Sequence, residues 1–530
     1  MPTPSLLPLP NGQAQFSGAS IPLPPTLRAA SASYGELPQG ILEVFAQRAG
    51  VTLSIEKPPL LLFYRNSSLP DEGYHLHVTE ERGIQVETAA EAGLCWALTT
   101  LYTLLEDGSV PCCDIMDAPR FPYRGLLLDS VRHFFPVETV KAFIEAMSLA
   151  KLNVLHWHLT NDQGWRIESK RFPALHEQCG DAYYTQEEIR EIVEFAACRG
   201  VEIIPELDLP GHTTSILSVY PELGCAGKKV RLGDAPGIYS VILCPGNEGV
   251  FDLLLPLLDE VAALFPSQRI HLGGDEAPKG EWQSCPRCRR RMEEEGLDTA
   301  EDLQGWFTAR LAAHLRGLGK RVICWNESLL ADGLPGDVPD LAIQYWAEMH
   351  HGGSTRRFWE AGGPVIFSDY LNVYLDQPHG FNSLERVYHY APGLPGFLPE
   401  APLPVSGKAK LAEAALGLEA CVWTEYIATP EKLAKMTFPR AYALAEAAWT
   451  QPSRKNYADF RRRLDAWLAR NPGMGFTPPE EADLKFPKRY QERFKFVYGQ
   501  AVAPRPENNG GAGGKIDPGY LKRWLKWYFT

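Results

Sequence analysis

The sequence predicts an α/β protein built on a (β/α)8 TIM barrel, preceded by a small α/β domain and followed by a helical C-terminal extension. Between residues 118 and 452, eight apolar segments alternate with helix-like segments, which is the signature of this barrel. The apolar segments show little apolar/polar alternation, as expected of parallel strands buried on both faces. The length of 530 residues also suits one large barrel with attachments.

The first predicted domain covers residues 1–117. Strand-like runs lie at 60–64 and 74–78, and a helix-like run with apolar residues at helical spacing follows at 90–105. The segment 117–122 contains two prolines and therefore marks a domain boundary.

The predicted barrel covers residues 118–452, and its elements follow one another in regular order. Its strands are predicted at residues 125–129, 153–160, 201–208, 269–276, 321–325, 341–346, 364–369 and 415–425. Its main helices are predicted at residues 137–151, 185–199, 249–265, 299–318, 356–361 and 430–449. Thr185 and Thr299 have side chains suited to capping the starts of their helices.

Residues 453–530 form the predicted C-terminal extension. This segment is helix-like at first, becomes rich in proline and glycine at 501–514, and ends in an aromatic stretch at 520–530. That end is compatible with packing on the barrel or with homodimer formation, and we favour packing.

Composition excludes several classes of partner. A net charge of −13 argues against nucleic acid or an anionic membrane surface as the main partner. No stretch approaches the ~20 apolar residues of a membrane span. The chain does not open with a basic segment followed by an apolar run, and its 11 cysteines are scattered, so we expect a cytoplasmic location.

Polar and aromatic residues gather at the carboxyl ends of the predicted strands, where barrel enzymes build their active sites. They are Asp129, Arg132, His156, His158, Asp162, Glu206, Asp208, His212, Asp275, Glu276, Trp325, Glu327, Trp346, Tyr374, Asp376, Trp423 and Glu425. So many carboxylates on one face indicate an enzyme that acts on a polyhydroxylated ligand.

The strongest local signal is the segment 271–276, His-Leu-Gly-Gly-Asp-Glu. Its two glycines allow a tight turn and leave room for a ligand. Asp275 and Glu276 then lie side by side, and their proximity should separate their pKa values. One protonated and one ionised carboxyl group are what general acid/base catalysis needs.

These motifs resemble those of the family-20 β-N-acetylhexosaminidases. The resemblance covers about residues 121–449 and the small domain before them, with motifs at residues 124–133, 155–162, 205–212, 271–276, 374–376 and 423–425. It implies a retaining exo-β-N-acetylhexosaminidase that hydrolyses terminal non-reducing β-linked GlcNAc or GalNAc through an oxazolinium intermediate, with the substrate's acetamido group as nucleophile.

The resemblance also implies a role for each residue. Glu276 is the general acid/base, Asp275 holds the acetamido N–H, and Tyr374 binds the acetamido oxygen. The remaining substrate-binding residues are Trp325, Trp346 and Trp423 around the sugar and its methyl group, and Arg132, Asp376 and Glu425 on the hydroxyls. His212 is also expected among the substrate-binding residues. Asp208 and His212 are expected to orient Asp275 or Glu276. His158 is expected to contact the substrate-binding residues without touching the substrate.

Two positions depart from the family pattern. Asn161 and Asp162 stand where the family has two acidic residues, and strand alternation favours Asp162 as the substrate-binding residue. Tyr390 stands where a tryptophan is frequent, so we expect a wider or more polar acetamido pocket. That pocket predicts activity on both GlcNAc and GalNAc substrates.

No cofactor and no catalytic metal are expected, but alternatives remain. His156 and His158 alternate on one strand and could ligate a metal in an amidohydrolase, although buried hydrogen-bonded histidines are the favoured interpretation. A glycosidase with a protein nucleophile and a non-catalytic glycan-binding barrel are two further alternatives. Cys285 and Cys288 form a C-x-x-C motif that would need two more zinc ligands, and Cys112 and Cys113 are remote in sequence, so we favour structural thiols.

Overall fold

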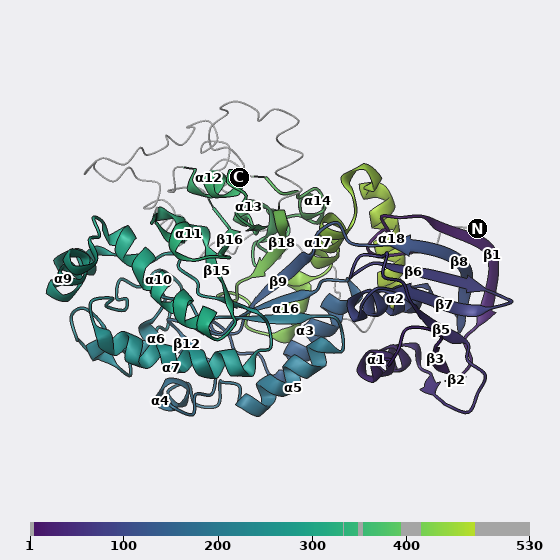
Figure 1. Ribbon diagram of the computed structural model, residues 1–530, viewed down its shortest axis with the longest axis horizontal. Coiled ribbons are helices and arrows are strands. Elements are labelled where there is room, and N and C mark those ends of the chain that lie inside the picture. The colour runs from purple at the N-terminus through teal and green to yellow at the C-terminus, as the bar shows by residue number, and fades with distance from the viewer. Residues whose placement is uncertain (1–4, 332, 348–352, 394–414, 472–530) are drawn as a thin grey trace.

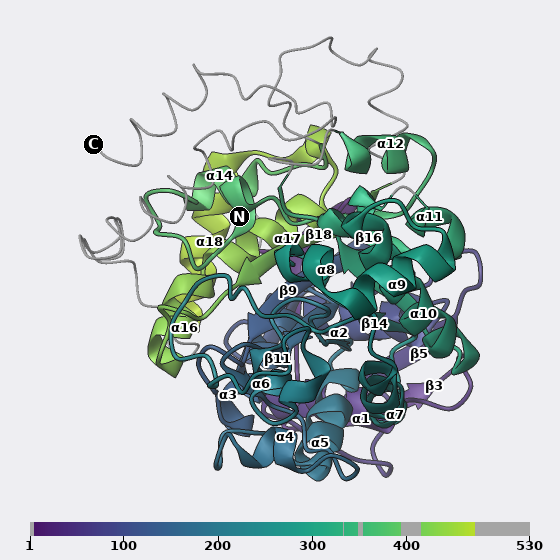
Figure 2. The same ribbon diagram turned by 90° about the vertical axis from the view of Figure 1, so that its left-hand side faces the viewer.

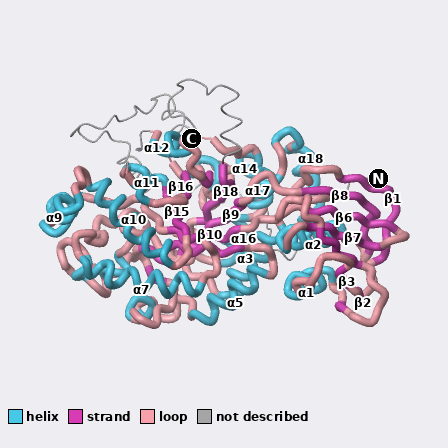
Figure 3. The backbone as a smooth tube through the Cα atoms, in the orientation of Figure 1, coloured by secondary structure: helices cyan, strands magenta, loops and turns pink. Residues whose placement is uncertain are grey.

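The computed structural model describes residues 5–331, 333–347, 353–393 and 415–471. Two bodies are visible in Figure 1: a barrel with its helices, and a smaller sheet domain at the N-terminus. In Figure 3 the strands form two separate groups, one inside the barrel and one in the small domain. The predicted fold class is therefore confirmed, whereas the boundaries at 117/118 and 452/453 stay predictions.

The small domain is a six-stranded sheet with two helices. The strand order is β1-β8-β6-β7-β5-β3. The strands are β1 (Ala14–Pro22), β3 (Ala29–Ser31), β5 (Leu61–Arg65), β6 (Tyr74–Thr79), β7 (Gly83–Thr88) and β8 (Ser109–Asp117), and the helices are α1 (Gln39–Ala49) and α2 (Glu91–Leu104). The predicted runs at 60–64, 74–78 and 90–105 correspond to β5, β6 and α2.

The barrel is closed by eight parallel strands in the order β10-β13-β14-β15-β16-β17-β18-β9. The strands are β9 (Tyr123–Asp129), β10 (Val154–His158), β13 (Glu202–Glu206), β14 (Arg269–His271), β15 (Arg321–Trp325), β16 (Ala342–Tyr345), β17 (Val365–Phe367) and β18 (Ala415–Val422). Each coincides with one of the eight predicted strands.

Helices surround this barrel and bury their apolar faces against it. The larger ones are α3 (Val137–Leu149), α5 (Gln186–Ala197), α7 (Glu248–Leu264), α10 (Ala300–Gly317), α16 (Pro430–Thr437) and α17 (Arg440–Trp449). Capping boxes start α5 at Thr185 and α10 at Thr299, as predicted.

Several barrel strands end earlier than predicted, and the fourth strand differs most. The fourth strand was predicted to reach Glu276, but β14 ends at His271. Gly273 and Gly274 have positive φ angles of 65° and 103°, which interrupt the extended backbone. The segment with Asp275 and Glu276 is consequently a loop that leaves the barrel rim.

Buried ion pairs join the small domain to the barrel. Arg124 on β9 is fully buried and its Nη2 lies 2.6 Å from Glu72 Oε1. The Arg124 guanidinium lies over the rings of Trp96 and Trp449, and Trp449 Nε1 donates to the Asp117 carboxylate. The catalytic loop lies at the opposite rim, because β9 enters the barrel at the Arg124 end.

The C-terminal extension begins with helix α18 (Tyr457–Arg470), which packs on α17. Arg463 Nη2 pairs with Glu446 Oε1 at 2.7 Å, and Trp467 Nε1 donates to Tyr442 Oη at 2.9 Å. Helix α18 therefore packs on the barrel, whereas the segments 501–514 and 520–530, including the end for which packing was predicted, lie outside the described residues. Among the described helices, none is both long and apolar enough to cross a membrane.

Candidate active site

The loop after β14 holds Asp275 and Glu276 in a tightly constrained backbone. Glu276 has a φ of 46°, a left-handed conformation that costs a non-glycine residue roughly 1–3 kcal/mol. A Cβ on Gly273 would lie 1.9 Å from Asp208 Oδ1, so glycine is required there. Gly274 N donates to the same Asp208 oxygen, and Gln304 Nε2 donates to Gly274 O at 2.8 Å. Contacts from the loop after β13 and from helix α10 thus restrain the backbone that carries the two carboxyl groups.

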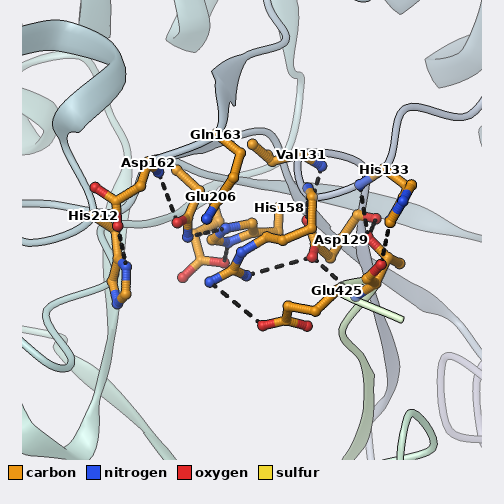
Figure 4. Close-up of polar contacts among 12 residues, drawn as sticks. Asp129, Val131, His133, His158, Asp162, Gln163, Glu206, His212 and Glu425 are labelled. Carbon is orange, nitrogen blue, oxygen red and sulfur yellow. Dashed lines mark hydrogen bonds and ion pairs between the residues drawn. The ribbon is translucent and has the colours of Figure 1, made fainter. Parts of the chain in front are cut away.

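His212 links this loop to the loop after β10. Its Nδ1 lies 3.0 Å from Asp162 Oδ2, and its Nε2 lies 3.5 Å from Glu276 Oε2 and 4.0 Å from Asp275 Oδ2. Figure 4 shows the Asp162–His212 contact at one side of the polar cluster. The imidazole therefore bridges a buried carboxylate and the predicted acid/base pair.

Asp162, which was predicted to bind the sugar, is engaged by protein groups on both carboxylate oxygens. Its side chain is fully buried, and Oδ1 accepts hydrogen bonds from the backbone N–H and the hydroxyl of Thr214 at 3.0 and 2.6 Å. Asn161 is buried as well, with its Nδ2 2.8 Å from His158 Nε2. The geometry makes Asp162 a positioning residue for His212.

Burial and neighbouring charges shift the pKa values of Asp275, Asp208 and His212. Burial, together with the neighbouring Glu276, raises the pKa of Asp275 to about 6. Burial and the charge of Asp275 raise the pKa of Asp208 well above its ordinary value. Burial opposes the charged form of His212, but Asp208, Asp162 and Glu276 outweigh it and raise the pKa of that imidazole well above its usual value. A cationic His212 therefore faces a cluster of carboxyl groups.

Glu327 completes the cluster from the loop after β15. Its Oε2 accepts a hydrogen bond from Glu276 N at 2.8 Å, which secures the left-handed residue. Burial, with the charges of Asp275 and Glu276, raises the pKa of Glu327 to about 8. The sequence indicated Glu327 as a strand-end carboxylate, but only the structure shows its contact with the backbone of Glu276.

The predicted aromatic residues of the site form one cluster. The rings of Trp325 and Trp423 are 6.1 Å apart, and those of Tyr374 and Trp423 are 6.4 Å apart. Trp346 belongs to the same cluster and contacts Tyr370, whose ring is 6.0 Å away. Trp325 is almost fully buried and donates its indole N–H to Glu206 at 2.8 Å, so it forms the base of this cluster. Tyr370 was not predicted as a site residue.

Tyr390, which was predicted to line the acetamido pocket, does not belong to this aromatic cluster. It packs in the larger barrel core, and its hydroxyl oxygen accepts a hydrogen bond from Asp369 N at 3.2 Å. This hydrogen bond to the Tyr390 hydroxyl stabilises the loop after β17.

The three charged residues predicted to bind the hydroxyls lie near one another. Arg132 lies over the Trp423 ring at 5.1 Å, with Nη1 3.4 Å from Asp129 Oδ2 and Nη2 3.9 Å from Glu425 Oε1. Figure 4 shows Asp129 and Glu425 at the two ends of this arrangement. Burial and the charge of Glu425 raise the pKa of Asp376 to about 8.

Several buried polar atoms of the predicted substrate-binding residues have no hydrogen-bond partner in the described part of the chain. They are Asp275 Oδ1, Asp376 Oδ1, Arg132 Nε and Trp346 Nε1. Buried polar atoms are nearly always paired in folded proteins, so four such atoms on predicted site residues suit a polar ligand.

The interior of the barrel beneath the pocket is a network of histidines and carboxylates. His158 Nδ1 contacts Glu206, as Figure 4 shows, and His156 lies between Glu206 at 3.3 Å and Glu419 at 2.9 Å. Burial opposes the charge of His156, but Glu419 and Glu206 raise its pKa to about 10. The favoured interpretation of His156 and His158 as buried, hydrogen-bonded histidines agrees with these contacts. Sequence reasoning missed Glu419, which looked like part of an apolar strand.

The same side chains are close enough to be considered as metal ligands. The groups are His156–Glu206–His271, His158–Glu206–Asp208 and Asp208–His212–Asp275. Each group already contains a contact between a histidine and a carboxylate. These ion pairs are sufficient to explain why the side chains lie so close together.

The fold and the site together define a barrel glycosidase, and comparison with known proteins specifies its family. Residues 121–452 match the model of the glycosyl hydrolase family 20 catalytic domain, and residues 3–118 match the model of domain 2 of that family. The chain belongs to glycosyl hydrolase family 20 and is a glycoside hydrolase.

Individual relatives agree with this assignment. A β-hexosaminidase of Porphyromonas gingivalis is 36% identical over 75% of this chain and 53% of its own length, and one of Vibrio furnissii is 34% identical over 72% and 66%. The chain thus spans about half to two thirds of these two relatives. Among solved structures, the β-N-acetylhexosaminidase of Bacteroides fragilis has a TM-score of 0.77 and 32% identity, over 89% of this chain and 97% of that one.

Proposed function

We propose that this chain is a retaining exo-β-N-acetylhexosaminidase that hydrolyses terminal non-reducing β-linked GlcNAc or GalNAc by substrate-assisted catalysis. The observation that supports the proposal is the pair Asp275–Glu276 together with the aromatic cluster of Tyr374, Trp346 and Trp423, of which Tyr374 interacts electrostatically with Asp275. Buried polar atoms of Asp275 and Trp346 also lack a hydrogen-bond partner among the described residues. An acetamido sugar has polar groups that can pair with these polar atoms and an apolar methyl group that can contact the aromatic rings.

The proposed reaction begins with the acetamido group of the bound sugar. Asp275 accepts its N–H and Tyr374 donates to its carbonyl oxygen, which then attacks the anomeric carbon. Glu276 protonates the glycosidic oxygen as the bond to the leaving group breaks, and an oxazolinium ion forms. Glu276 next deprotonates the water that opens this ion, so the anomeric configuration is retained. An intramolecular nucleophile gains from an effective molarity of roughly 10⁵–10⁸ M.

Arg132, Asp376 and Glu425 are proposed to bind the hydroxyls of the terminal sugar. Hydrogen bonds to charged groups contribute about 1.5–3 kcal/mol each, so a clamp of this kind selects a chain end. The name β-hexosaminidase, which the relatives carry, is compatible with both GlcNAc and GalNAc. A GalNAc-to-GlcNAc rate ratio below about one in a hundred, some 2.7 kcal/mol, would contradict the dual specificity.

The first test compares p-nitrophenyl β-N-acetylglucosaminide with p-nitrophenyl β-glucoside. We expect cleavage of the acetamido sugar alone, with the β anomer of the product formed first. Equal cleavage of both sugars would indicate a protein nucleophile, and cleavage of neither would favour a glycan-binding barrel.

A second test concerns the acid. Glu276→Gln should lower the rate on a β-linked GlcNAc disaccharide by about 100- to 10,000-fold. The loss should be smaller on the p-nitrophenyl glycoside, because p-nitrophenolate leaves without protonation. Asp298→Asn, a carboxylate-to-amide change at an exposed position that follows helix α9 (Pro286–Glu295), is the matched control and should leave both rates unchanged.

A further inference from the structure

Four cysteines from distant parts of the chain converge outside the catalytic pocket. The Sγ atoms of Cys225, Cys244, Cys285 and Cys288 all lie within 4.8 Å of one another. Cys244 Sγ is 3.5 Å from Cys288 Sγ and 3.8 Å from Cys285 Sγ, and Cys225 Sγ is 3.7 Å from Cys288 Sγ. The second pair beside the C-x-x-C motif is therefore Cys225 and Cys244, and not Cys112 and Cys113.

We propose that these four thiolates together bind one zinc ion in a structural site. Zinc–sulfur bonds are about 2.3 Å, so the sulfurs of a tetrahedral site are separated by roughly 3.8 Å. The three sulfur–sulfur distances of 3.5–3.8 Å match that separation. Disulfide-bonded sulfurs would instead lie about 2.0 Å apart.

The backbone around the four thiols is arranged as a pair of ligand loops. An isolated bridge between Gly224 and Leu243 brings Cys225 beside Cys244. A Cβ on Gly246 would lie 2.5 Å from Cys288 N, so glycine permits the loop of Cys244 to approach the C-x-x-C turn. That turn is formed where Cys285 immediately precedes α9 and Cys288 lies in its first turn.

Burial and charge both suit a closed metal site. Cys244, Cys285 and Cys288 are at most 5% exposed and Cys225 is partly exposed, so no coordination position needs to stay open to solvent. Four thiolates and one Zn²⁺ carry a net charge of −2. The guanidinium of Arg287 lies beside them and donates to Cys225 O at 3.3 Å and to Gly224 O at 2.8 Å.

The proposed ion connects two loops that build the active site. Cys225 and Cys244 belong to the chain after β13, which also carries His212, whereas Cys285 and Cys288 follow β14 and the catalytic pair. Figure 2 shows α9, together with α8 (Gly280–Ser284), on the side of the barrel turned towards the viewer. The buried Trp282 and Ala277 share an apolar cluster with three of the thiols, so the metal would hold the segment directly after Glu276.

The test begins with the metal content of the full-length wild-type chain, measured by plasma mass spectrometry after dialysis. We expect about one zinc ion per chain. A mercurial that modifies thiols should release that zinc, and Co²⁺ bound to the metal-free protein should show a thiolate-to-cobalt charge-transfer band and the intense d–d bands of tetrahedral coordination. Less than about a tenth of an ion per chain, with no such Co²⁺ spectrum, would overturn the proposal.

Variants locate the ion in the chain. Cys225→Ser and Cys285→Ser should each lose the bound zinc, whereas Cys198→Ser, which alters a cysteine that lies beside Gly40 of the small domain, should keep it. Zinc retained by both cluster variants would refute the site. After metal removal in denaturant, all 11 cysteines should react with a thiol reagent. A shortfall of two or four thiols in the unreduced protein would identify disulfides in place of the metal site.

Discussion

The contact between Glu327 and the backbone of Glu276 predicts that Glu327 affects activity without touching the substrate. Glu276 has a φ of 46°, and the hydrogen bond of 2.8 Å from its N–H to Glu327 Oε2 opposes relaxation of that backbone. Removing the acceptor leaves the N–H of Glu276 without a protein partner, and an unpaired buried donor costs about 1–3 kcal/mol. If Glu327→Ala loses that amount from the transition state, kcat/KM falls about 5- to 150-fold.

The conservative variant separates positioning from charge. Glu327→Gln keeps an oxygen that can accept the N–H, and the pKa of about 8 means that Glu327 is itself largely neutral at pH 7. We therefore expect Glu327→Gln to stay within about threefold of wild type near pH 7. The assay is kcat/KM on p-nitrophenyl β-N-acetylglucosaminide, with the midpoint of thermal unfolding measured in parallel. An alanine variant as active as wild type, or a glutamine variant as impaired as alanine, would refute the reasoning.

Further predictions concern stability. Gly273→Ala should unfold at a lower temperature and lose activity, because the new Cβ would lie 1.9 Å from Asp208 Oδ1; a wild-type melting curve would contradict this. Arg124→Met removes one partner of a buried ion pair with Glu72, so we expect a loss of about 3–5 kcal/mol in the free energy of unfolding, measured by urea titration. The folded-state pKa of Asp376, raised to about 8 by burial and Glu425, lies above its unfolded value. Its contribution to stability should therefore be lost as pH rises from about 4 to 8, and Asp376→Asn should remove that part of the pH dependence of unfolding.

The barrel could be predicted from the sequence because its strands are short, apolar and regularly spaced. The eight predicted strands match the barrel strands, and the strand-end residues Asp275, Tyr374 and Trp423 gather at one rim, since parallel strands all end there. Capping signals at Thr185 and Thr299 were equally reliable because an N-cap acts within a single turn of helix.

Contacts that depend on two distant segments could not be predicted. Asp162 was predicted to bind the sugar because strand alternation places it on the same side as His156 and His158. Its carboxylate instead accepts a hydrogen bond from Thr214 and pairs with His212. Glu419 looked like one polar residue in an apolar run, because nothing local reveals that His156 lies across the barrel from it. Cys225 and Cys244 were separated from the C-x-x-C motif by long stretches of chain, and only folding brings them together.

The catalytic loop is restrained from three sides, and this restraint explains how a strained residue can be maintained at the centre of the site. Glu327 holds the N–H of Glu276, His212 contacts its carboxylate, and the cysteine cluster with Trp282 packs against the segment that follows. These partners come from the segments that follow β13, β14 and β15. The cost of the left-handed backbone is thereby offset by interactions spread over the fold. A rigid orientation is what an acid/base residue needs when it must serve the leaving group first and the water molecule next.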